Sequence, residues 1–246
     1  MIRTLAVLLC LASIGAAAAN ATTLTACPKG TEAALHDVAL PRMRAAALQQ
    51  RRLAILAVGG SATSGAAAGD AANSYPTRLA ARLSAELPAT EVTMTVRAIS
   101  RSSASAVVER LDADLADSKP SLVIWGVGGL EAGRHVDLDR FTRTLQRGIA
   151  KAHQAGADVI IMDLLYAPSL ARLADLTTYR DATLTVATEL GVRVLTRHDL
   201  MRQWHDAGQL DLDATDPAVR VAVAGQLFDC FAAILVNGIT SALHRN

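Results

Sequence analysis

The stretch that decides the fold is LAILAVGGSATSG, residues 53–65. Its first six residues are apolar without polar alternation, which predicts a strand buried on both faces, as in a parallel sheet. Gly59 and Gly60 then allow a sharp turn just past the strand. Ligands of open α/β sheets bind beyond such strand ends. We therefore expect Ser61 to be displayed where a nucleophile would sit.

Outward from this strand, strand-like runs alternate with helical patterns along the rest of the chain. Strands are predicted over residues 91–96, 121–125, 157–162 and 192–195. Helices are predicted over residues 41–52, 74–87, 103–115, 138–154, 177–190, 198–207 and 217–243, with Ser74 and Asp216 as capping residues. This alternation predicts a three-layer α/β/α sandwich around a five-stranded parallel sheet.

Size and composition limit the classes of function. The chain has 246 residues, of which 51% are hydrophobic, and a formal net charge of +1. A single α/β domain is the simplest interpretation. Nucleic acid is not expected as a partner, because its usual footprint is a strongly basic stripe. Asp211, Asp213 and Asp216 lack the histidines or the EF-hand spacing of a metal site, so no metal or other cofactor is expected.

The N-terminus has the pattern of a secretory signal peptide. Arg3 precedes an apolar run over residues 5–19, and small residues follow up to Ala21. We expect a signal peptide over residues 1–21, an N-terminal extension over 22–52 and the folded domain over 53–246; the alternative for the first segment is a buried helix. The mature protein is then periplasmic or secreted. No other stretch approaches the ~18 uninterrupted apolar residues of a membrane span.

Two cysteines remain once Cys10 has left with the signal peptide. Cys27 lies near the start of the mature chain and Cys230 near its end. An even pair in an oxidising compartment predicts a disulfide that fastens the N-terminal segment to the last helix. The alternative is a lipoprotein processing site at residues 24–27 (LTAC), with Cys27 acylated. Polar residues between the apolar run and Cys27 favour the disulfide.

Six segments, in this order, resemble the SGNH or GDSL hydrolases, which are serine esterases with a flavodoxin-like sheet. The segments are AVGGSATSG (57–65), SYPTRL (74–79), LVIW (122–125), MDLLYAP (162–168), LMRQW (200–204) and FDC (228–230). The similarity covers almost all of the mature chain. It implies a sheet of this family's type and, in the ancestral reaction, acyl transfer from an O-acyl substrate to Ser61 and then to water.

The resemblance also implies that the oxyanion site has changed. Ser61 matches the nucleophile of the family, but Gly60 replaces the usual aspartate before it. The family takes one oxyanion donor from a glycine amide after the second strand and another from an asparagine after the third. Those positions fall on Arg101 and Leu130. Leucine cannot donate a hydrogen bond, and losing one oxyanion donor typically costs about 100- to 1000-fold in turnover.

The base and its orienting carboxylate are missing as well. The family supplies both from an Asp-x-x-His element before the last helix, and a count back from Cys230 without gaps places Val219 and Ala222 there. Neither side chain carries a proton, and a serine hydroxyl is a poor nucleophile without a base. His135, on the loop after the third strand, is the best-placed substitute. His153, His198 and His205 are expected in surface or packing roles.

These departures predict a secreted pseudoenzyme that retains a ligand-binding cleft. Its expected ligand is an acylated glycan or another small molecule of the cell envelope, and a scaffold or partner-docking role is nearly as well supported. The expected cleft residues are Gly59, Gly60, Arg101, Gly129, Leu130 and Glu131. The alternative is an active serine esterase in which the gapless count misplaces the last block, or in which His135 serves Ser61 as a base.

Overall fold

The structure, a computed structural model, describes residues 27–31, 34–35 and 39–245. The expected signal peptide, residues 1–21, lies outside the described residues, as do residues 22–26 of the expected extension. Cleavage of the signal peptide and the periplasmic or secreted localisation therefore stay predictions.

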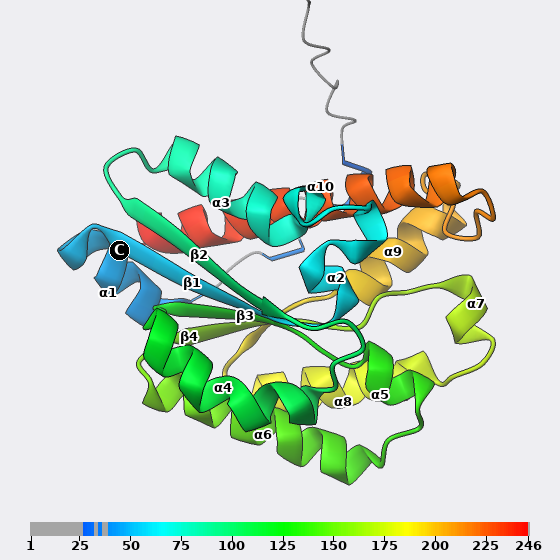
Figure 1. Cartoon of the computed structure of the whole chain (residues 1–246), viewed down its shortest axis with the longest axis horizontal. Coiled ribbons are helices and arrows are strands. Elements are labelled where there is room, and N and C mark those ends of the chain that lie inside the picture. Colours follow the sequence, from blue (N-terminus) through cyan, green and yellow to red (C-terminus); the bar gives the residue numbers. More distant parts are fainter. Residues whose placement is uncertain (1–26, 32–33, 36–38, 246) are drawn as a thin grey trace, which may run out of the picture.

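A five-stranded sheet forms the centre of the fold, and all its strands are parallel (Figure 1). The strand order is β2-β1-β3-β4-β5, which is the flavodoxin-like order. The predicted fold class is confirmed. The strands are β1 (Arg52–Gly59), β2 (Glu91–Ala98), β3 (Leu122–Gly126), β4 (Asp158–Met162) and β5 (Arg193–Leu195).

Helices cover both faces of the sheet and give the three expected layers (Figure 1). One face packs against α1 (Pro41–Gln50), α3 (Tyr75–Glu86), α9 (Arg197–Asp206) and α10 (Pro217–His244). The other packs against α4 (Ala104–Ser118), α6 (Leu138–Gln154) and α8 (Leu176–Glu189). Short segments at the loop ends are α2 (Ser61–Ser64), η1 (Ala66–Ala68), η2 (Ala71–Asn73), α5 (Gly129–Gly133) and α7 (Pro168–Ala171).

Two helix starts follow the predicted capping chemistry. The Ser74 hydroxyl accepts a hydrogen bond from the Thr77 amide at the start of α3. The Asp216 carboxylate accepts from the amides of Ala218 and Val219 at the start of α10. Caps of this kind contribute about 1 kcal/mol each.

Part of the N-terminal extension belongs to the core. Met43 of α1 is fully buried, and its amide donates to the carboxylate of Asp158 at 2.9 Å. Arg42 pairs with the same carboxylate at 3.2 Å. The packed unit therefore includes α1, which precedes Leu53.

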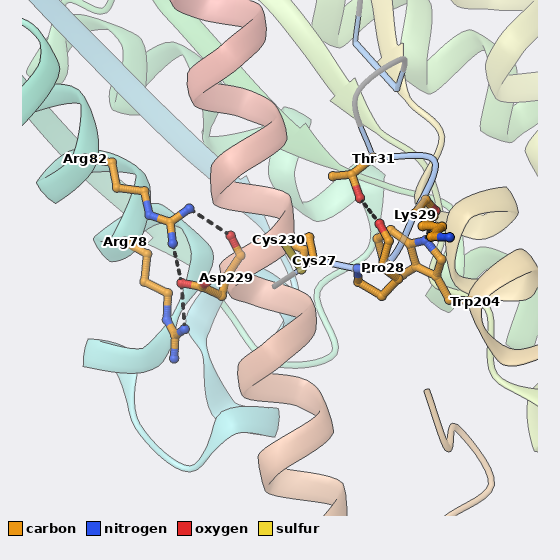
Figure 2. The surroundings of a disulfide bond; sticks show 9 residues. All are labelled: Cys27, Pro28, Lys29, Thr31, Arg78, Arg82, Trp204, Asp229 and Cys230. Carbon is orange, nitrogen blue, oxygen red and sulfur yellow. Dashed lines mark hydrogen bonds and ion pairs between the residues drawn. A yellow bond between two sulfur atoms is a disulfide. The ribbon is translucent and has the colours of Figure 1, made fainter. Parts of the chain in front are cut away.

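Cys27 and Cys230 are joined by a disulfide across 203 residues, with their Cα atoms 5.4 Å apart (Figure 2). The N-terminal segment then runs to α9, where the Trp204 indole donates to the carbonyl of Lys29 at 3.1 Å. Beside the disulfide, Asp229 of α10 pairs with two arginines of α3, Arg78 and Arg82. The predicted pairing is present in the structure.

Helix α10 is long and apolar enough to cross a membrane by length and composition, and it is the one such helix among the described residues. Of its most apolar window, 56% is buried inside the fold. The ion-paired Asp229 lies within it. These are features of the core helix of a packed domain.

Candidate functional site

A cavity of about 370 Å³ lies at the carboxyl ends of β1 and β3. This is the point where the strand order reverses, and open α/β sheets place their ligands there. Ser61, Arg101 and Leu130 all line the cavity, as the resemblance implies. Its walls are Gly60, Ser61, Ala62, Thr63, Arg101, Ser102, Ala104, Gly126, Val127, Gly128, Gly129, Leu130, Glu131, Leu164, Leu165, Ala167, Leu170 and Arg197.

Ser61 is mounted by the turn at the end of β1. Gly59 has φ +149°, and a Cβ there would lie 2.7 Å from Thr63 Oγ1 and 3.1 Å from the carbonyl oxygen of Gly126. Only glycine fits this close approach. Ser61 therefore begins α2 with its side chain exposed at the cavity.

The hydroxyl of Ser61 has a weak polar neighbour. Its Oγ donates to Ser100 Oγ at 3.4 Å, which is a long hydrogen bond to a group that is no base at neutral pH. Among the cavity walls, the ionisable side chains are Arg101, Glu131 and Arg197. Two of the three are cations, so Glu131 is the one wall residue that can accept a proton.

Glu131 is already engaged by the backbone. Its Oε1 accepts the amide hydrogen of Ala104 at 2.6 Å, and the residue is 4% exposed. A carboxylate at this position satisfies the first turn of α4 and interacts favourably with its positive end. Glu131 thus fixes the helix beside the cavity instead of facing Ser61 as a free base.

The structure does not bring His135 to Ser61. His135 lies on the exposed turn after α5, in a left-handed conformation with φ +51°, and it is not a cavity wall. His198 is buried and packs edge-on against Tyr166. His205 also packs near Tyr166. Neither of these two lines the cavity.

Arg101, which the resemblance aligns with the oxyanion glycine of the family, has a backbone conformation that favours glycine. Its φ is +60°, in the left-handed region that costs a residue with a Cβ about 1 kcal/mol. Leu130, which the resemblance aligns with the oxyanion asparagine, lines the cavity with an apolar side chain. Gly129 lies beside it, and a Cβ there would meet nothing within 4 Å.

The positions counted for the family's Asp-x-x-His element fall inside a helix. Val219 and Ala222 belong to the N-terminal part of α10, and Val219 is 42% exposed. Neither is a cavity wall. Within the described part of the chain, no cluster of three His, Cys, Asp or Glu side chains has the arrangement of a metal site. Asp211 and Asp216 bind backbone amides of their own loop and helix.

A buried arginine and a buried aspartate beside the cavity, Arg197 and Asp163, were missed in the sequence. Arg197 is 3% exposed and donates from Nε to the carbonyl oxygen of Asp163 at 2.8 Å. The Asp163 carboxylate accepts from the amide of His198 at 3.1 Å. Burial raises the pKa of Asp163 to about 7, against the opposing effect of the Arg197 charge. The signal available was a charged residue just after each of two strands, Asp163 directly after β4 and Arg197 two residues after β5.

Comparison with known proteins agrees with this geometry. The model of the Non-GDSL lipase-like family matches residues 26–245. No curated protein matches the chain.

Solved structures share the fold at low sequence identity. TesA has a TM-score of 0.59 at 23% identity, over 74% of this chain and 97% of its own. A catalytic mutant of Axe2, an acetylxylan esterase from Geobacillus stearothermophilus, has a TM-score of 0.60 at 18% identity, over 75% and 93%. LAE5, an alpha/beta hydrolase from the Lake Arreo metagenome, has a TM-score of 0.59 at 19% identity, over 78% and 96%.

Proposed function

Because the chain belongs to the Non-GDSL lipase-like family, we propose that it is a secreted, non-catalytic member that binds an O-acylated glycan through the cavity beside Ser61. The family's SGNH-hydrolase-like fold supplies the concave site.

One observation carries the non-catalytic part of the proposal. The cavity wall holds Ser61 but no free base, because the single carboxylate of the wall, that of Glu131, accepts a hydrogen bond from the Ala104 amide. An unactivated serine hydroxyl does not attack an ester at a useful rate. His135, the base of the competing esterase hypothesis, lies outside the wall.

The cavity walls favour an acyl group as part of the ligand. Apolar side chains converge on one side of the cavity from the loops after β3 and β4. Small-molecule sites combine such a surface with a few polar groups that fix orientation. Here the polar groups are Ser61, Ser102 and Arg101 at the opposite wall. The apolar residues are Val127, Leu130, Leu164, Leu165, Ala167 and Leu170.

The glycan part of the proposal has support from similarity. One structural neighbour is named an acetylxylan esterase, which acts on an acylated polysaccharide. On this proposal the cavity beside Ser61 contacts both the acyl group and the sugar without a base that could activate the serine. Secretion is supported by the signal-peptide pattern and by the disulfide between Cys27 and Cys230.

Calorimetric titration with an acetylated xylooligosaccharide tests this function. The probe is expected to bind the purified protein without being deacetylated. Its chemically deacetylated form is expected to bind about tenfold more weakly, since a buried acetyl group contributes about 1.4 kcal/mol or more. Gly129→Phe fills the cavity and should abolish binding. Gly133→Phe, on the same short helix but outside the walls, is the matched control. The proposal would be rejected if the acetylated and deacetylated sugars bound equally well. It would also be rejected if Gly129→Phe and Gly133→Phe bound the acetylated sugar equally well.

A further inference from the structure

Two further hollows continue from the cavity along the surface. One of about 180 Å³ shares Ala104, Leu130 and Glu131 with it. A shallow one of about 450 Å³ shares Arg140 with the first hollow. Together they run from the cavity mouth across α5 to α6, two helices on the same side of the sheet (Figure 1).

Arginines follow this course from end to end. Arg101 stands in the cavity, Arg134 and Arg140 in the first hollow, and Arg143 and Arg147 in the last. All five are exposed. We call the set Arg101, Arg134, Arg140, Arg143 and Arg147 the arginine trough.

Among the described residues, the trough arginines share a lack of acidic partners. Arg42, Arg82 and Arg180 are examples of arginines that pair with a carboxylate elsewhere on the molecule. Over residues 27–31, 34–35 and 39–245, no ion pair is recorded for any trough arginine. An unpaired cluster of one sign in a chain of net charge +1 produces a strong local potential.

The acidic residues near the trough do not neutralise it. Glu131 lies between the cavity and the first hollow, but it is buried against the Ala104 amide. Asp137 accepts from the Arg140 backbone amide as the cap of α6. Asp139 is exposed in the first turn and is not a hollow wall. Beyond the trough, Lys151 pairs with Asp112.

We propose that the arginine trough binds an anionic polysaccharide, whose chain lies along α6 and places one residue in the cavity. Arg140, Arg143 and Arg147 recur on one face of α6, about 4.5 and 6 Å apart along its axis, which is the scale of one sugar residue. Guanidinium groups bind carboxylates and sulfates through paired hydrogen bonds. The ligand class is therefore a glycan with regularly spaced acidic groups.

Nucleic acid fits the trough less well. Proteins that bind single strands combine basic grooves with exposed aromatic side chains that stack on bases. The one aromatic residue in the walls of the three hollows is Phe141, which is 1% exposed.

Affinity electrophoresis and calorimetry with polygalacturonate test the proposal, with neutral xylan and single-stranded DNA as comparison polymers. The trough variant replaces Arg134, Arg140, Arg143 and Arg147 by glutamine. The control variant replaces four exposed cations outside the trough by glutamine, namely Arg51, Arg52, Lys119 and Arg202. The two variants therefore have the same net charge. The trough variant is expected to weaken polygalacturonate binding by about tenfold or more. Added salt should weaken wild-type binding.

The choice of a glycan rests on the proposed function, but the two can fail separately. Gly129→Phe should keep most polygalacturonate binding through α6 while it abolishes acetylated-oligosaccharide binding. Equal losses in the trough and control variants, no polygalacturonate binding, or tighter binding of DNA would overturn the trough proposal. None of these outcomes would change the result with acetylated xylooligosaccharide.

Discussion

Arg197, at the start of α9, donates a hydrogen bond from Nε to the backbone carbonyl oxygen of Asp163, just after β4, at 2.8 Å. A second nitrogen, Nη2, donates to the carbonyl of Met162 at 3.0 Å. The guanidinium thus links the loop after β4 to the helix after β5 and closes the floor of the cavity.

Replacement of Arg197 by methionine should destabilise the protein by about 2–4 kcal/mol, because the buried carbonyl oxygens of Met162 and Asp163 lose their hydrogen-bond donor. Arg202→Met, on the exposed side of the same helix, should change stability by less than about 0.5 kcal/mol. Urea unfolding followed by circular dichroism measures both. Similar effects of the two substitutions would contradict the role assigned to Arg197.

Asp163 makes stability depend on pH. Its pKa is about 7 in the fold against an ordinary 3.8, so the folded state binds a proton that the unfolded chain releases between these values. This proton uptake contributes about 4 kcal/mol to the free energy of unfolding. The contribution is complete below pH 3.8 and is lost as the pH rises through 7. Asp163→Asn keeps an oxygen for the His198 amide and should remove this slope. Denaturant unfolding from pH 4 to 8 compares the two proteins; parallel curves would exclude Asp163 as the source.

Arg101 is predicted to carry backbone strain. Because its φ is +60°, Arg101→Gly should stabilise the protein by up to about 1 kcal/mol, as less strain outweighs the greater freedom of the unfolded glycine. Arg101→Ala keeps a Cβ and should give no such gain. Thermal unfolding of the two variants separates removal of strain from removal of charge. A larger gain for alanine than for glycine would refute the interpretation.

The disulfide predicts a large effect of reduction. Closure of a loop of this length contributes about 5 kcal/mol in the chain-entropy model. Cys27→Ser with Cys230→Ser should lower the melting temperature, and dithiothreitol should lower that of the wild type but not of the double variant. Intact-mass analysis checks the same cysteines, since a lipid on Cys27 would exclude the disulfide.

The strands, their order and the edge carrying Ser61 could be predicted because they follow from local patterns. The run 53–58 is apolar on both faces, and parallel strands bring their carboxyl ends to one edge. The family resemblance singled out Arg101 and Leu130, and both line the cavity together with Ser61.

Other features depend on contacts that sequence spacing does not encode. The hydrogen bond from Arg197 to the Asp163 carbonyl joins the start of α9 to the loop after β4, and each residue alone is an ordinary polar residue after a strand. Glu131 was expected to bind ligand, but its contact with the Ala104 amide requires the packing of α5 against α4. The arginines of the trough lie in separate segments of the sequence, and only the fold brings them into one row. The formal net charge of +1 for the whole chain gives no sign of this local cluster.

Ester hydrolysis tests the central claim most directly. Wild type, Ser61→Ala and His135→Ala are incubated with p-nitrophenyl acetate, and the wild type is also treated with a fluorophosphonate probe followed by peptide mapping. The account predicts equal background turnover by all three proteins and no label on Ser61. Turnover that disappears in Ser61→Ala, or a label on Ser61, would contradict it; a parallel loss in His135→Ala would identify the base.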